Sequence, residues 1–170
     1  MKLFYRALFV LFSAATLTNV FASDCNPAPK DVAVLKEIRA QFFTVEGPLA
    51  EFDPCHKSVK LQKNLFGGKQ PLMIEVHGGG GVDSATKNAV EAFRSAGFAT
   101  LIFDAYELNG FYQGYKFWGN KASNEARQRM IYKAALGAYA WAIKNQDIDN
   151  SQIYFHGLSN GANVVANLAG

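Results

Sequence analysis

The chain has 170 residues, of which 49% are hydrophobic and 18% charged, and its formal net charge is +3. This is an ordinary globular composition, long enough for one domain with a sizeable core, and it selects no function by itself. The charge is too close to neutral for a nucleic-acid-binding footprint, so nucleic acid is excluded as an expected partner.

The N-terminus, "MKLFYRALFVLFSAATLTNVFA", is typical of a secretory signal peptide. Basic residues come first, an apolar run extends from Ala7 to about Leu17, and small residues precede the expected cleavage before Ser23. A membrane anchor is the alternative, but a span needs about 20 apolar residues and Thr16 already interrupts this run. We therefore expect residues 1–22 to be removed on export to the periplasm or the extracellular space, with no stable membrane anchor.

Export changes how the two cysteines of the chain are interpreted. An oxidising compartment lets Cys25 and Cys55 pair, and the closed loop would contribute about 3 to 4 kcal/mol. Lipidation of Cys25 is the rival, but Asp24 before it lacks the small, uncharged character of a lipoprotein cleavage site. A metal site at Cys55 and His56 has too few ligands. We predict a disulfide between Cys25 and Cys55, and neither a metal ion nor a cofactor.

Residues 23–69 are expected to form an N-terminal extension. The apolar spacing in "DVAVLKEIRAQF", from Asp31, is closer to a helical face than to alternation and predicts a short helix. The segment "SVKLQKNLFGGKQP" then predicts a hairpin with Gly67 and Gly68 at its turn, and Pro71 opens the next element.

Residues 70–170 show a regular alternation of strands and helices. The expected strands are "LMIEVH", "FATLIFD" and "SQIYFHG", and the expected helices run from near Ser84 to Gly97, from about 123 to 145, and onward from Gly161. Strands joined by helices of this length pair in parallel through right-handed crossovers. The pattern predicts an α/β fold of three layers with a mostly parallel sheet.

The candidate site lies where these strands end, because ligands of such sheets bind at the carboxyl ends of the strands. The sequence "GLSNG" places Ser159 between Gly157 and Gly161, after a predicted strand and before a predicted helix. Gly-x-Ser-x-Gly is a weak motif alone, but this context is that of a strained turn bearing a nucleophilic serine. The "HGGGG" loop after the first strand supplies backbone N–H donors at Gly78 and Gly79, and Asn160 supplies another, as an oxyanion hole requires.

Four segments, "LMIEVHGGGG", "GFATLIFDAY", "NGF" and "DIDNSQIYFHGLSNGA", together resemble the dienelactone hydrolase family of the α/β-hydrolase superfamily. The resemblance covers about residues 70 to 170. It implies an α/β-hydrolase fold, a nucleophile at Ser159, and oxyanion donors from Asn160 and the Gly78 to Gly79 region. The name-giving enzymes of the family use cysteine as the nucleophile, so a serine esterase is expected here rather than a strict lactonase.

A nucleotide-binding loop is the main alternative for the glycines. Asp104 stands at a strand end about 23 residues after Gly81, where a ribose-binding acid would lie. The fingerprint breaks at Ser84, where glycine or alanine is expected, and no phosphate-binding lysine follows. Export would also remove the chain from the usual dinucleotide pool.

The remaining polar candidates are expected to be structural. His77 and His156 each end a strand, His56 is expected at the surface, and Asp104 is expected to tie a loop. Acid residues of such triads follow the nucleophile along the chain, and Asp104 precedes it. One loop gathers aromatic side chains that either line an apolar pocket or pack beneath it: Tyr106, Phe111, Tyr112, Tyr115, Phe117 and Trp118.

These observations predict an exported serine hydrolase that acts on a small-molecule ester or lactone through an acyl-enzyme. A serine peptidase of the same fold is the runner-up, and an inactive hydrolase-derived fragment and a dinucleotide-binding module also stay open. Triads of this superfamily run Ser, Asp or Glu, then His, but "NGANVVANLAG" after Ser159 contains neither an acid nor a histidine. We therefore expect an α/β-hydrolase fold truncated after the helix that follows the nucleophile, with its acid and base elsewhere.

Overall fold

The computed structural model describes residues 49–63, 67–111 and 121–169. The predicted signal peptide, the helix predicted from Asp31 and most of the aromatic loop lie outside these residues. So does Cys25, and the predicted disulfide therefore stays a prediction.

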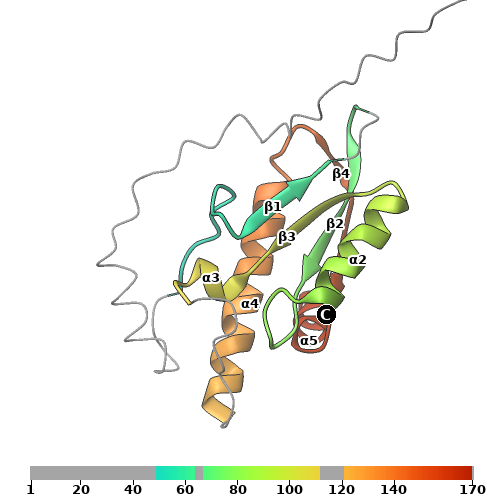
Figure 1. Ribbon diagram of the computed structural model, residues 1–170. Coiled ribbons are helices and arrows are strands. Elements are labelled where there is room, and N and C mark those ends of the chain that lie inside the picture. Colours follow the sequence, from blue (N-terminus) through green and yellow to red (C-terminus); the bar gives the residue numbers. More distant parts are fainter. Residues whose placement is uncertain (1–48, 64–66, 112–120, 170) are drawn as a thin grey trace, which may run out of the picture.

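Four strands form one mixed sheet in the order β1-β3-β2-β4, in which β2 runs parallel to β3 and β4, and β1 runs antiparallel to β3. This confirms the predicted α/β class (Figure 1). In chain order the elements are β1 (Val59–Gln62), β2 (Gln70–Val76), α2 (Ser84–Ser95), β3 (Ala99–Phe103), α3 (Ala105–Leu108), α4 (Lys121–Ala142), β4 (Ile148–Gly157) and α5 (Asn160–Ala169).

Helices cover both faces of the sheet (Figure 1). The chain passes from β2 through α2 to β3 on one side of β2, and from β3 through α4 to β4 on its other side. The two crossovers run in opposite directions along the sheet, and because crossovers between parallel strands are almost always right-handed, α2 and α4 lie on opposite faces. Helix α5 packs against α4 and β4. The arrangement makes β2 an inner strand and brings its carboxyl end beside that of β4.

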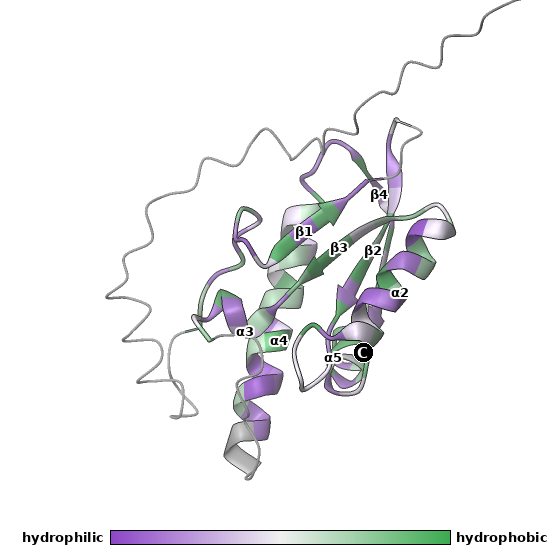
Figure 2. Cartoon of the chain, in the orientation of Figure 1, coloured by the Kyte–Doolittle hydropathy of each residue, from purple (hydrophilic) through white to green (hydrophobic). Residues whose placement is uncertain are grey.

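The core lies between the sheet and α4. Leu72, Ile74 and Val76 of β2, with Leu101 and Phe103 of β3, are fully buried in one cluster that includes the inner side of α4. Their alternation follows from the two-residue period of a strand, which sends every second side chain to the same face. Figure 2 shows β3 as mostly hydrophobic, as expected for a strand covered on both faces.

Helix α2 begins and ends as its sequence predicts. Asp83 is its N-cap, and the Oδ1 atom accepts a hydrogen bond of 2.9 Å from the backbone N–H of Thr86. Gly97, just beyond the helix, has φ of 96°, the left-handed conformation that commonly ends helices. The helix runs from Ser84 to Ser95, in agreement with the predicted start near Ser84 and stop at Gly97.

The predicted hairpin between β1 and β2 is wrong. Gly67 and Gly68 do have the positive φ expected of turn residues, 66° and 78°, but β1 pairs with β3, where Val59 lies opposite Phe103. The physical reason is that β3 and β4 occupy both edges of β2 and leave none for β1. The turn therefore serves a crossing connection, which has the same local sequence pattern as a hairpin turn.

Candidate active site

Ser159 occupies a strained turn between β4 and α5. Its φ is 53°, and it is the one residue other than glycine with a positive φ in the described part of the chain. A side chain in this left-handed region costs about 1 to 2 kcal/mol, so the surrounding structure must impose the conformation. Ser159 is exposed. The geometry is that of a turn that projects a serine hydroxyl from the carboxyl edge of a sheet.

Backbone crowding explains the two glycines that flank Ser159. A Cβ atom on Gly157 would lie 2.5 Å from the carbonyl carbon and oxygen of Gly161. A Cβ atom on Gly161 would lie 2.6 Å from the carbonyl oxygen of His77 and still closer to that of Val76. Both distances are far below van der Waals contact. Helix α5 can therefore start this close to β4 and β2 only because Gly157 and Gly161 have no side chain. The Gly-x-Ser-x-Gly spacing is thus a packing requirement of this turn.

The glycine loop after β2 lies directly against the serine turn. A Cβ atom on Gly78 would lie 3.2 Å from the carbonyl oxygen of Leu158 and 3.4 Å from the Cβ atom of Ser159. A Cβ atom on Gly79 would lie 2.9 Å from the side-chain amide nitrogen of Asn160. The structure therefore brings together Gly78, Gly79, Ser159 and Asn160, the residues selected from the sequence.

Two backbone donors at this junction have no acceptor in the part of the chain that the structure describes. Within the described residues, the N–H groups of Gly79 and Asn160 donate to no carbonyl or side chain. Asn160 is the first residue of α5, where N–H groups have no partner within the helix and the helix dipole favours negative charge. Donors of this kind beside a serine hydroxyl can bind a developing oxyanion.

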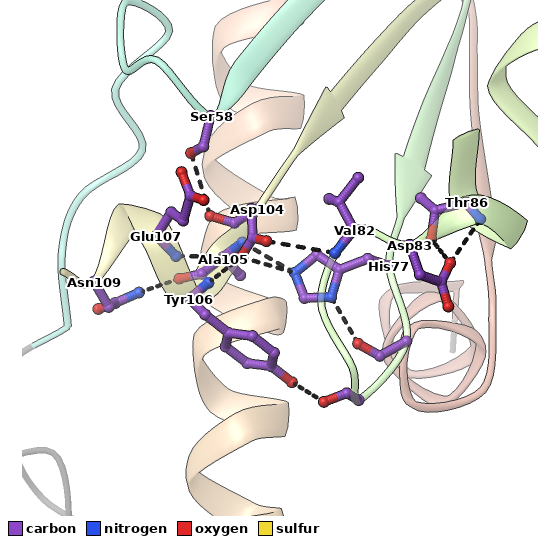
Figure 3. A network of polar contacts seen from close by, with 12 residues as sticks. Ser58, His77, Val82, Asp83, Thr86, Asp104, Ala105, Tyr106, Glu107 and Asn109 are labelled. Carbon is purple, nitrogen blue, oxygen red and sulfur yellow. Dashed lines mark hydrogen bonds and ion pairs between the residues drawn. The ribbon is translucent and has the colours of Figure 1, made fainter. Parts of the chain in front are cut away.

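His77 connects the glycine loop to the start of α3 (Figure 3). It is fully buried; its Nδ1 atom lies 2.7 Å from the carbonyl oxygen of Gly78, and its Nε2 atom accepts a hydrogen bond of 3.0 Å from the N–H of Ala105. Because Nε2 accepts, the proton of the neutral ring is on Nδ1, which donates to Gly78. Burial lowers the pKa of His77, although Asp104 opposes this shift. Both ring nitrogens are thus committed to the backbone.

Asp104 caps α3 and fastens it to the loop (Figure 3). Its Oδ1 atom accepts hydrogen bonds from the N–H groups of Tyr106, at 2.9 Å, and Glu107, at 3.2 Å. Its Oδ2 atom accepts a longer one, 3.4 Å, from the N–H of Val82. The carboxylate is buried, and each of these hydrogen bonds joins it to a backbone N–H group. A ribose hydroxyl would have to displace these bonds.

Sequence reasoning missed Arg127 as a functional candidate, and it placed Tyr106 only among the aromatic side chains, without its contact to the glycine loop. The Tyr106 hydroxyl donates to the carbonyl oxygen of Gly79 at 3.2 Å, and its ring packs edge-on against His77. Burial raises the pKa of Tyr106, so its hydroxyl stays a donor. The Arg127 side chain on α4 is only 5% exposed, and its Nη1 atom would lie 3.5 Å from a Cβ atom on Gly79. Their residue types gave no signal, because tyrosine and arginine suit an aromatic loop and a helix surface equally well.

Phe111 is buried in the core with Tyr106, which supports packing rather than pocket lining for these two aromatics. Four other members of the predicted aromatic group lie outside the described residues: Tyr112, Tyr115, Phe117 and Trp118.

No histidine of the chain is arranged as a base for Ser159. All three are described, and besides His77 these are His56, whose Nδ1 atom lies 2.7 Å from the hydroxyl of Ser58, and His156, whose Nδ1 atom lies 2.7 Å from Glu75. None of them forms a hydrogen bond with Ser159 within the described residues. Ser159 thus lies beside two backbone donors, and no histidine among the described residues is placed to take its proton.

No family model matches the chain, and no curated protein matches it. In the part of the chain that the structure describes, no helix is both long and apolar enough to cross a membrane. The same residues contain no group of three or more His, Cys, Asp or Glu side chains suited to holding a metal ion.

Proposed function

We propose that the protein is an exported serine hydrolase of the α/β-hydrolase fold, of the dienelactone hydrolase type, which acts on an ester or lactone. The observation that carries the proposal is the left-handed Ser159, with φ of 53°, between β4 and α5 and against the glycine loop of β2. Strained residues at strand ends are characteristic of functional sites, because the strain has to be imposed by surrounding structure. Here close glycine packing imposes it.

In the proposed reaction each group has one role. The Ser159 oxygen attacks the substrate carbonyl carbon and loses its proton to a base, while the carbonyl oxygen takes negative charge. The N–H groups of Gly79 and Asn160 donate to that oxygen. The carbon–oxygen bond to the leaving alcohol then breaks, the alcohol takes the proton from the base, and an acyl group stays on Ser159. Water attacks the acyl carbonyl in the same way and releases the acid.

The base for these steps must come from outside the described contacts. His77 gives both ring nitrogens to backbone partners, and His156 points its Nδ1 atom at Glu75. A positioned general base contributes about a hundredfold to ten-thousandfold in rate. We propose that the described residues supply no base to Ser159, and that the chain by itself turns over esters poorly.

Imidazole in solution can replace a missing base, and this tests the proposal. A fluorophosphonate should label Ser159 slowly, and added imidazole should accelerate labelling at least about tenfold. The adduct is located by peptide mass spectrometry, with Ser159→Ala as the negative control. Ser151→Ala is the matched control, since Ser151 is an exposed serine on β4, the strand that precedes the Ser159 turn.

Labelling that persists in Ser159→Ala, or that spreads equally over exposed serines, would contradict the proposal. Absence of labelling even with imidazole would favour the inactive fragment. Cleavage of a peptide but not of an ester by an imidazole-rescued chain would favour the peptidase.

A further inference from the structure

A buried acid–imidazole pair links β2 and β4 on the face of the sheet that α2 covers. The Glu75 side chain is fully buried, and its Oε2 atom lies 2.7 Å from the Nδ1 atom of His156, whose side chain is 35% exposed. The two residues are direct neighbours in the parallel register of the strands. The pair is separate from the core, which lies on the opposite face.

The location of the pair relates it to the candidate active site. One register position further on, Val76 lies beside Gly157, and the N–H of Leu158 donates to the carbonyl oxygen of Val76 at 3.2 Å. Beyond this point β2 continues into the glycine loop and β4 into the Ser159 turn. The Glu75–His156 contact is thus the last side-chain interaction that joins the two strands before the site.

The surroundings leave His156 as the main compensation for the Glu75 charge. The second carboxylate oxygen, Oε1, is buried without a partner among the described residues. Helix α2 contributes the Phe93 ring, which packs edge-on against His156 with 5.1 Å between ring centroids. Burial raises the pKa of Glu75, and His156 opposes this shift. A buried charge of this kind depends strongly on its single partner.

Other charged or titratable groups on this face are at the solvent. On α2, Glu91 and Arg94 form an ion pair with each other, and Lys87 is exposed. On β1, Lys60 shares this face and is exposed as well. On β4, Tyr154 is also exposed, and the neighbouring strand β3 contributes only uncharged side chains to this face. None of these groups is placed to replace the imidazole.

We propose that Glu75 and His156 are positioning residues, whose contact fixes the spacing between the glycine loop and the Ser159 turn. With a proton on both ring nitrogens, His156 holds the carboxylate by a charge-assisted hydrogen bond, which is stronger than a neutral one. When the ring loses one proton, the attraction between the strands weakens and the two loops separate slightly. The protonation of His156 is thereby transmitted to the backbone donors at Gly79 and Asn160. The catalytic consequence rests on the proposed function, whereas the coupling itself does not.

Nuclear magnetic resonance of the folded chain tests the coupling directly. The imidazole of His156 and the backbone amides of Gly79 and Asn160 are followed between about pH 5 and 8. We expect both amides to shift with the midpoint of His156, and this shift to vanish in Glu75→Gln and in His156→Gln. His77 touches the loop as well, so the shared midpoint and its loss in both variants identify the source. Amides that do not follow His156 would overturn the proposal.

Ser159 labelling tests the consequence. In the presence of imidazole, Ser159 in the folded Glu75→Gln and His156→Gln chains should be labelled about tenfold more slowly than in the unaltered chain. The labelling rate of these variants should also lack the change with pH that the unaltered chain shows at the His156 midpoint. The paired change Glu75→Met with His156→Phe keeps an apolar contact in case a single variant fails to fold, and it should also lack the step. A folded variant that keeps the original rate and pH profile would overturn the proposal. If the unaltered chain is never labelled, the proposed function fails, while the amide shifts still decide the coupling.

Discussion

The two loops that meet at the candidate site are held by different physical means. The glycine loop after β2 rests on a polar network in which His77, Asp104 and Tyr106 bind backbone groups. The turn after β4 has no such network among the described residues, and its shape follows from the crowding of Gly157 and Gly161 against neighbouring backbone. A polar network that loses one hydrogen bond keeps the others, whereas an added side chain at a crowded glycine forces the backbone to move. The turn should therefore tolerate change far less than the loop does.

The largest effect is expected for Gly161→Ala. The new methyl group would lie 2.6 Å from the carbonyl oxygen of His77, so α5 or β2 must move. Overpacking usually costs about 1 to 3 kcal/mol, and a clash with rigid backbone belongs at or above the upper end. Chemical denaturation should show a loss of about 3 kcal/mol or more in the free energy of unfolding.

Gly80→Ala is the matched control for this experiment. Gly80 belongs to the neighbouring loop, and a Cβ atom there would meet nothing within 4 Å. Its φ lies outside the positive region, so alanine is not strained there. We expect a change within about 0.5 kcal/mol. Equal losses in the two variants would contradict the distinction between crowded turn and open loop.

The polar network should make the loop sensitive to pH through His77. Burial lowers the pKa of His77 below its ordinary 6.5, so the unfolded chain binds this proton at a higher pH than the folded chain does. The free energy of unfolding should therefore fall as the pH decreases from 6.5 towards the folded pKa, by up to about 1.4 kcal/mol per pH unit.

His77→Gln isolates this contribution, because glutamine retains an acceptor and a donor but does not titrate. The difference in the free energy of unfolding between the unaltered chain and His77→Gln should shrink as the pH falls below 6.5. Glu75 acts in the opposite sense: its pKa is raised from 4.5, so its contribution falls as the pH rises above that value. It is common to both chains and cancels in the difference. A difference that is constant with pH would mean that His77 is not held neutral.

The sequence predicted the site better than it predicted the sheet. Gly78 and Ser159 were expected on one rim because both follow parallel strands, and local glycine patterns mark both positions. The predicted partner strand of β1 was wrong. The sequence "VKLQ" is equally suited to pair with β2 or with β3, and the hairpin is excluded only because both edges of β2 are occupied. Local pattern fixes a turn, but competition between strand edges decides what it connects.

The supporting residues needed the strand register. A charged Glu75 inside the apolar run "LMIEVH" signals a buried acid that requires a partner. Nothing local identifies His156 as that partner, because the pairing depends on how β4 aligns with β2. The structural role expected for His77 agrees with its two backbone hydrogen bonds, although their partners, Gly78 and Ala105, were beyond sequence reasoning.

The smallest effect concerns the strain at Ser159 and separates backbone from side chain. Ser159→Ala and Ser159→Gly both remove the hydroxyl, so neither should be labelled by a fluorophosphonate. Only glycine relieves the left-handed φ of 53°, a relief of about 1 to 2 kcal/mol. Glycine also adds about 0.4 to 1 kcal/mol of unfolded-state entropy, which offsets part of that gain. We therefore expect Ser159→Gly to be more stable than Ser159→Ala by about 0.5 to 1 kcal/mol in chemical denaturation.

If glycine were less stable than alanine, the turn would be unstrained, and the observation that carries the proposed function would lose its force. If glycine were more stable, the turn would hold the serine at a cost in stability, as functional sites commonly do.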